Sequence, residues 1–191
     1  MRTETHSHIR AKTKTTSRSK TEDGRNHSAA RAVPRRQIAL ERIYDASLAD
    51  LWRLWTTKDG IEAWWGPAGF CVRVHKLELR PGGELLHAMT AVGAEQIQFM
   101  LRAGLPLTTE ARVTYTEVVP RRRLVYEQLA DFVPGVAPYV VRTSVELQPS
   151  PPGVKMILVF DAMHDEEWTN MSVQGRESEL DRLAEALAKG V

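Results

Sequence analysis

The chain has 191 residues, 42% of them hydrophobic, which suits one domain with a well-formed core and makes a second full domain unexpected. Its formal net charge of +2 is unevenly distributed. Residues 1–36 carry ten Lys/Arg against three Asp/Glu, a net +7, and the remainder carries sixteen against twenty-one, a net −5. The alkaline pI therefore reflects the N-terminal segment, and it gives no support to nucleic-acid binding by the folded domain.

Residues 1–36 are rich in Ser, Thr, Lys and Arg and nearly devoid of apolar side chains, so we expect a disordered basic tail. Three functional interpretations compete with a quiet, solvated tail, which the composition favours. The segment has the Arg-rich, acid-poor composition of an organelle-targeting peptide. It could also act as a salt-sensitive phosphate-binding arm. A metal site on His6 and His8 would lack a third ligand.

The lone cysteine, Cys71, cannot form a disulfide within the chain, which is typical of a reducing compartment. It begins an expected strand, so we predict a buried or half-buried structural thiol. No 18-residue apolar run is present, and the first 35 residues lack the apolar stretch of a signal peptide. These features predict a cytoplasmic protein without a membrane span.

The domain expected over 37–191 opens with a strand at 37–44 and two short helices. Ser47 and Asp50 have the spacing of a helix N-terminal cap. Apolar residues then recur at helical spacing: Leu48, Leu51, Trp52 and Trp55. Thr57 can cap a second, short helix that runs through Trp64 and is stopped by Gly66 and Pro67.

From residue 71 the hydrophobic period changes to two, which indicates strands. We expect them at 72–80, 85–89, 112–119 with a continuation at 124–126, 139–147 and 154–160. The strand at 139–147 alternates most clearly between apolar and polar residues. Strands in series with short turns imply an antiparallel sheet.

A long helix is expected from the acidic residues at 165–167 to Lys189-Gly190, with Leu180, Leu183 and Leu187 as its buried stripe. A sheet that is apolar on one face needs a cover, and this is the only long helix in the sequence. The helix should therefore lie across the concave face of the sheet, with an apolar pocket between them.

Several short motifs occur in a specific order along this region. They are Asp45-Ala46-Ser47, Leu51-Trp52, Trp55-Thr56, Trp64-Trp65-Gly66-Pro67, Leu79-Arg80-Pro81-Gly82-Gly83, and Tyr115-Thr116-Glu117-Val118-Val119-Pro120 followed by Arg123-Leu124-Val125. From Ile38 to Leu187 the chain resembles the SRPBCC (START-like) superfamily, and within it the branch named after the activator of the ninety-kilodalton heat-shock chaperone ATPase. The resemblance implies an α+β helix-grip fold: a curved antiparallel sheet wrapped around the C-terminal helix, with two short helices after the first strand closing one end.

Two segments depart from the commoner family pattern. Residues 92–110 are longer than the usual hairpin and, with 161–168, resemble an uncharacterised subgroup. The last helix carries Gly175-Arg176 where the family pattern has Gly followed by Trp. Both changes alter the expected lining of the pocket.

The leading functional hypothesis is a binder of a small, largely apolar molecule, including acidic amphiphiles, between sheet and helix. The expected lining residues are Trp64, Leu85, His87, Met89, Tyr115, Tyr139, Val141, Met156, Leu158 and Arg176. Arg176 shares the buried stripe of the helix, so we hypothesise that it binds a carboxylate or phosphate head group at the pocket mouth. The competing interpretations are an arginine that reaches solvent, tryptophans that only plug the core, and a hydrogen-bonded core histidine.

No catalytic, cofactor or metal motif is recognisable. The chain lacks a phosphate-cradling glycine loop, a Gly-x-Ser-x-Gly elbow, paired cysteines and a dinucleotide fingerprint. Helix-start chemistry accounts for His164 beside the acids at 165–166. An enzyme of cyclase, dehydratase or hydrolase type would need His87, Glu117 or His164 to converge in the pocket. A co-chaperone role, with a chaperone partner, rests only on the name of the family.

Overall fold

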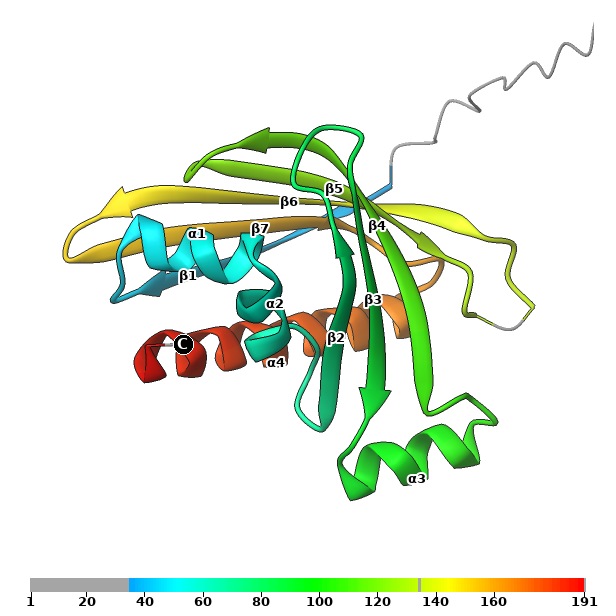
Figure 1. The fold of residues 1–191 in the computed structure, drawn as a ribbon. Coiled ribbons are helices and arrows are strands. Elements are labelled where there is room, and N and C mark those ends of the chain that lie inside the picture. The colour runs from blue at the N-terminus through cyan, green and yellow to red at the C-terminus, as the bar shows by residue number, and fades with distance from the viewer. Residues whose placement is uncertain (1–34, 134, 191) are drawn as a thin grey trace, which may run out of the picture. The chain divides into compact units, whose positions relative to one another are not determined.

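The computed structural model describes residues 35–133 and 135–190, so the predicted basic tail lies outside the described residues up to position 34. The elements in chain order are β1 (Gln37–Tyr44), α1 (Leu48–Thr56), α2 (Lys58–Trp64), β2 (Phe70–Leu77), β3 (Glu84–Ala91), α3 (Ala94–Arg102), β4 (Thr108–Val119), β5 (Arg123–Ala130), β6 (Tyr139–Ser150), β7 (Gly153–Asp161) and α4 (Glu166–Lys189). The strands form one seven-stranded antiparallel sheet in the order β1-β7-β6-β5-β4-β3-β2 (Figure 1).

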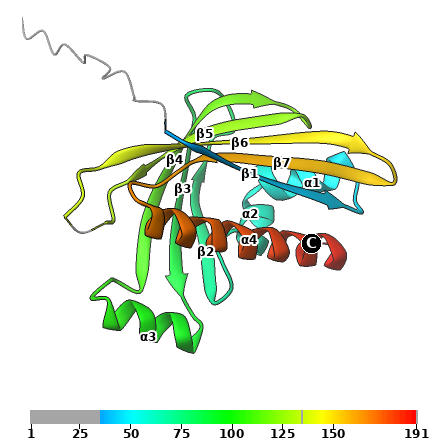
Figure 2. The ribbon, with the colours of Figure 1, turned by 180° about the vertical axis from the view of Figure 1, so that it is seen from behind.

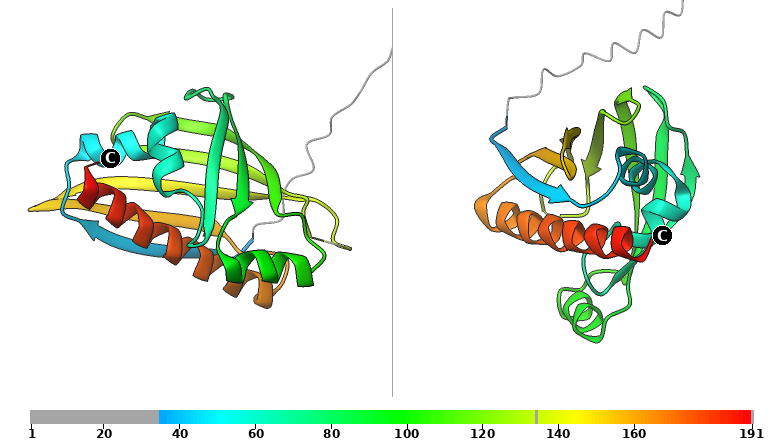
Figure 3. Two further views of the ribbon diagram at one scale, coloured as in Figure 1. Left: turned by 60° about the horizontal axis from the view of Figure 1, so that its bottom comes forward. Right: turned by 90° about the vertical axis from the view of Figure 1, so that its left-hand side faces the viewer.

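The sheet curls around α4, as the view towards the C-terminal end of that helix shows (Figure 3). Seen from behind, α4 runs along the concave side of the sheet (Figure 2). α1 and α2 lie against its C-terminal half, where the Tyr44 hydroxyl donates to the Leu180 carbonyl over 3.3 Å. This arrangement confirms the helix-grip fold that the sequence predicted.

Capping residues set the ends of three helices where the sequence placed them. The Ser47 hydroxyl accepts from the Asp50 amide at 3.1 Å, and the Thr57 hydroxyl accepts from the Gly60 amide at 3.1 Å. The Asp165 carboxylate accepts from the Trp168 amide at 2.8 Å and begins α4, which ends at Gly190 with φ of 67°. These caps satisfy amide groups that an isolated helix end leaves unpaired.

The core lies between the concave face of the sheet and the three helices α1, α2 and α4. Alternate residues of β6 and β7 point into it, as their period-two pattern predicted. Residues that are at most 2% exposed include Leu51, Leu54, Trp55, Ile61, Trp64, Leu85, Tyr115, Tyr126, Met156, Leu158 and Leu183. These residues form one continuous apolar cluster.

Some details differ from the sequence prediction. The long segment after β3 contains a helix, α3, which projects away from the sheet (Figure 1) and buries none of its residues. The helix was missed although Ile97, Met100 and Leu101 recur at helical spacing, because residues 92–110 were interpreted only as a longer hairpin connection. β2 ends at Leu77, not at residue 80, because the Glu78 amide bonds back to the Glu84 carbonyl and closes the hairpin. Cys71 is exposed, which corrects the predicted buried thiol, because it lies on the outer face of β2.

Among the described residues, no helix is both long and apolar enough to cross a membrane.

Candidate functional site

A set of polar side chains lies on the concave face of the sheet, inside the apolar core. Tyr115 of β4 is directly opposite Tyr126 of β5, which is opposite Thr143 of β6. Each of the three is 1% exposed, and His87 of β3 is 2% exposed. Arg176 of α4 faces them from the helix side. We refer to His87, Tyr115, Tyr126, Thr143 and Arg176 as the inner polar cluster.

Four members of this cluster have a buried polar atom without a hydrogen-bond partner among the described residues. These atoms are Nδ1 of His87, the hydroxyls of Tyr115 and Tyr126, and Oγ1 of Thr143. Burial raises the pKa of Tyr126, and Arg176 and Thr143, which lie within reach of its hydroxyl, lower it as hydrogen-bond donors would, although neither contact has strict hydrogen-bonding geometry. Each unpaired buried polar group costs about 1–3 kcal/mol. Such groups are rare in native proteins, so four on adjacent strands make this face of the sheet the candidate site.

The cluster has an aromatic wall formed by Trp65, the residue that follows α2. Its ring centroid lies 5.8 Å from that of His87 and 5.7 Å from that of Tyr126. The Tyr115 and Tyr126 rings meet edge to face at 6.5 Å. The unpaired polar atoms are therefore set among flat apolar surfaces.

Arg176 is paired within α4. Its Nη1 donates to the Glu179 carboxylate at 3.0 Å, and the two side chains are only 14% and 8% exposed. Its guanidinium carbon also lies 5.9 Å from the centre of the Phe160 ring. The charge of Arg176 is thus matched by a buried carboxylate one turn further along the helix.

Burial sets the protonation states of the cluster. Burial, with smaller contributions from the charges of Arg176 and His75, lowers the pKa of His87 to about 4. Burial also raises the pKa of the Tyr115 and Tyr126 hydroxyls. Burial alone would lower the pKa of Arg176, but the proximity of Tyr126 and Glu179 outweighs this and raises it. At neutral pH the cluster therefore has a neutral imidazole, two intact phenols and one internal ion pair.

Of the other seven predicted lining residues, six lie in three places, and Tyr139 lies apart from them. Leu85, Met156 and Leu158 are fully buried in the apolar core, and Met89 packs against it. Val141 is 8% exposed and lies on β6 two residues before Thr143, on the same face of the strand. Trp64 packs against Trp55, and its indole N–H donates to the Leu54 carbonyl at 2.9 Å.

Four residues of the site were not among the predicted lining: Trp65, Tyr126, Thr143 and Glu179. The alternation of β6 placed Thr143 on the inner face, so that signal was present in the sequence. Tyr126 becomes notable only when the register pairs it with Tyr115. Glu179 resembled an ordinary surface acid until its helix face was known.

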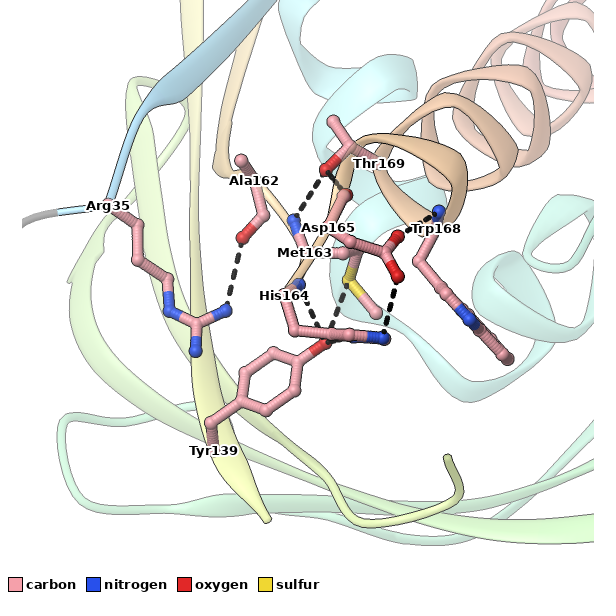
Figure 4. Close-up of polar contacts among 8 residues, drawn as sticks. All are labelled: Arg35, Tyr139, Ala162, Met163, His164, Asp165, Trp168 and Thr169. Atoms are coloured by element: carbon pink, nitrogen blue, oxygen red, sulfur yellow. Dashed lines mark hydrogen bonds and ion pairs between the residues drawn. The ribbon is translucent and has the colours of Figure 1, made fainter. Parts of the chain in front are cut away.

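Tyr139 belongs to a second polar group, at the start of α4 (Figure 4). Its hydroxyl lies 3.0 Å from Nδ1 of His164, whose Nε2 is 3.2 Å from the Asp165 carboxylate. Arg35 covers the Tyr139 ring at 3.8 Å and donates to the Ala162 carbonyl at 3.3 Å. These contacts tie β6, the segment before β1 and the first turn of α4 together, which is a sufficient structural role for His164.

His87, Glu117 and His164, the side chains considered for a cyclase, dehydratase or hydrolase, lie apart from one another. His87 lies beside Trp65, Glu117 pairs with Arg123 at 3.2 Å, and His164 pairs with Tyr139. Within residues 35–133 and 135–190, no three side chains of metal-binding type are grouped.

Two surface hollows lie outside the grip. One, of about 730 Å³, is lined by Phe70, Ala94, Glu95, Gln96, Gln98, Phe99 and Arg102 next to α3. The other, of about 330 Å³, lies beside the turn between β4 and β5 and the neighbouring β6, near Glu117, Arg122 and Gln148. Space is also present beside α4, where a Cβ added to Gly175 would have no atom within 4 Å.

Comparison with known proteins agrees with this architecture. A family model described as "Activator of Hsp90 ATPase homolog 1-like protein" matches residues 45–188. Protein CV1439 from Chromobacterium violaceum aligns with a TM-score of 0.65 at 22% identity, over 79% of this chain and 96% of that chain. The AHSA1-like protein from Aeromonas hydrophila aligns with a TM-score of 0.63 at 20% identity, over 81% and 94%. A comparison with curated protein sequences gave no match. The chain therefore belongs to the AHSA1-like family of the SRPBCC superfamily.

Proposed function

We propose that the domain binds a small, largely apolar molecule between the concave face of the sheet and α4. The observation that carries this proposal is the set of four unpaired polar atoms in the inner polar cluster. A molecule with one polar end would satisfy these atoms and place its apolar body against Trp65 and the core.

Gly175 of α4 is partly exposed, and the position of its missing Cβ has free space around it. Gly175 lies one turn before Glu179 and therefore on the same side of α4, which is buried at Glu179. Glycine in the middle of a helix lowers helix stability, so its presence there is consistent with a need for room. Core side chains fill much of the interior, so entry of a guest requires them to move apart.

The test uses N-phenyl-1-naphthylamine, an uncharged probe whose fluorescence rises in an apolar site. We expect the wild type to bind one equivalent, and Gly175→Leu to bind it at least tenfold more weakly, because the leucine occupies the free space. Gln174→Leu is the matched control, since it adds the same side chain at the preceding position of α4, which is exposed. Circular dichroism checks that both variants fold. Equal binding by all three proteins, or none by the wild type, would contradict the proposal.

A protein partner is a second candidate, favoured by α3. This helix buries none of its residues, and Phe99 and Leu101 are 51% and 57% exposed. The family name suggests the Hsp90 ATPase as the partner to test. Stimulation of purified Hsp90 ATPase that Phe99→Ser with Leu101→Ser abolishes would support this role, and no stimulation by the wild type would exclude it.

A further inference from the structure

We infer that the molecule held at the inner polar cluster is uncharged and presents a hydrogen-bond-accepting oxygen, such as a carbonyl, to the hydroxyls of Tyr115 and Tyr126. This inference rests on the proposed function and names the chemical class of its ligand. It differs from the acidic head group that the sequence suggested for Arg176.

The charges at the site argue against an ionic ligand. Arg176 is already paired with Glu179 at 3.0 Å, in a setting where both side chains are nearly buried. A carboxylate that approached Arg176 would lie beside the carboxylate of Glu179, and like charges in a buried site repel strongly. A cationic ligand would face the same difficulty with Arg176. Only an uncharged guest leaves the ion pair undisturbed.

The unpaired atoms argue for an acceptor on the ligand. Tyr115 and Tyr126 stand opposite each other on neighbouring strands, and burial keeps both hydroxyls protonated. Each hydroxyl has one proton to donate, and a carbonyl oxygen has two lone pairs to receive them. Thr143, opposite Tyr126 on the other side, offers a third hydroxyl. A pure hydrocarbon would leave all of these groups unpaired.

The wall around these hydroxyls favours a flat apolar body on the same molecule. Trp65 lies within 6 Å, between ring centroids, of both His87 and Tyr126. Aromatic rings in such offset or tilted arrangements attract one another beyond the area they bury. A planar, uncharged carbonyl compound combines both requirements.

Three naphthalenes of similar size test the inference by displacement of N-phenyl-1-naphthylamine. They are 2-acetylnaphthalene, which is an uncharged ketone, 2-naphthoate, which is an anion, and 2-ethylnaphthalene, which has no polar group. We expect the ketone to bind about tenfold more tightly than either of the others at pH 7.

Two variants remove the hydroxyls, and one is a matched control. Tyr115→Phe and Tyr126→Phe should each weaken ketone binding about fivefold and leave hydrocarbon binding unchanged. The ligand-free variants should also unfold at higher urea than the wild type, because each loses an unpaired buried hydroxyl. Tyr44→Phe is the control: this hydroxyl is also buried but donates to the Leu180 carbonyl, so its loss should lower stability and leave ketone preference intact.

The outcomes separate the inference from the proposed function. Tightest binding of 2-naphthoate, or a ketone preference that survives both tyrosine variants, would overturn the inference and leave the binding function in place. Failure of all three compounds and the fluorescent probe to bind the wild type would overturn both.

Discussion

The stability of the protein should depend on pH through His87, because this titratable side chain lies inside the core. It is 2% exposed, and burial lowers its pKa from 6.5 to about 4. The folded state therefore resists protonation, and the unfolded chain accepts a proton near pH 6.5. Its contribution to stability is fully present above pH 6.5 and is lost as the pH falls towards 4.

This difference in pKa corresponds to about 3 kcal/mol in total, of which about 2 kcal/mol is lost between pH 7 and pH 5. Urea denaturation at both pH values measures the loss directly, as a decrease of about 1 M in the midpoint at a slope of about 2 kcal/mol/M. His87→Gln cannot be protonated, so the variant should lose about 2 kcal/mol less than the wild type over this range.

His75→Gln is the control, since His75 lies half-exposed on β2, 3.5 Å from Glu110. It should retain nearly all of the wild-type pH dependence. An NMR titration of the His87 ring in the folded protein provides an independent measure. If His87 titrates near 6.5, or if His87→Gln keeps the full pH dependence of the wild type, the account of a dry, neutral imidazole is wrong.

Four further predictions concern the elements that frame the site. Gly175→Ala should stabilise the protein by about 0.5–1 kcal/mol, as seen in urea denaturation, because its Cβ meets no atom. Gly60→Ala should destabilise it by at least about 1 kcal/mol, because there the Cβ would lie 2.6 Å from the Arg53 carbonyl oxygen. Asp165→Ala should cost about 1 kcal/mol through loss of the α4 cap, and Asp165→Asn, which can still cap, should cost clearly less; equal losses would place the effect in the His164 contact instead. Arg182→Lys should speed amide exchange in the 66–70 loop and cost about 1–3 kcal/mol, because the Arg182 Nη1 donates to the Gly66 and Phe70 carbonyls at 2.5 and 3.1 Å; unchanged exchange there would refute this role.

The fold was predictable because its determinants are local and repeated. Caps at Ser47, Thr57 and Asp165 fixed three helix starts, and period-two alternation identified the strands. Because the sheet has one apolar face and the sequence predicts a single long helix, few arrangements bury the apolar side of both. α3 carries the same kind of signal in Ile97, Met100 and Leu101, but none of its residues is buried, so packing against the sheet could not have placed it.

The inner polar cluster was predictable only in part, because its chemistry depends on register. Tyr115, His87 and Arg176 could each be assigned to an inner face from their own element. The pairing of Tyr115 with Tyr126, and of Tyr126 with Thr143, joins segments that are eleven and seventeen residues apart through strand bulges and loops that sequence spacing does not determine. The hypothesis of an anionic head group at Arg176 could not take Glu179 into account, because only the structure shows that the two side chains pair.

The same geometry is the reason for proposing the cluster as a binding site. A core assembled for stability alone would place phenylalanine at positions 115 and 126, where the hydroxyls have no partner. Tyr44 illustrates the contrast, because its equally buried hydroxyl has a carbonyl to donate to. The ligand-free domain is less stable because it retains two unpaired phenols, an unpaired imidazole nitrogen and an unpaired threonine hydroxyl beside the internal ion pair. If the proposal is right, an uncharged acceptor recovers that cost, and Tyr126→Phe should show higher ligand-free stability together with weaker ketone binding.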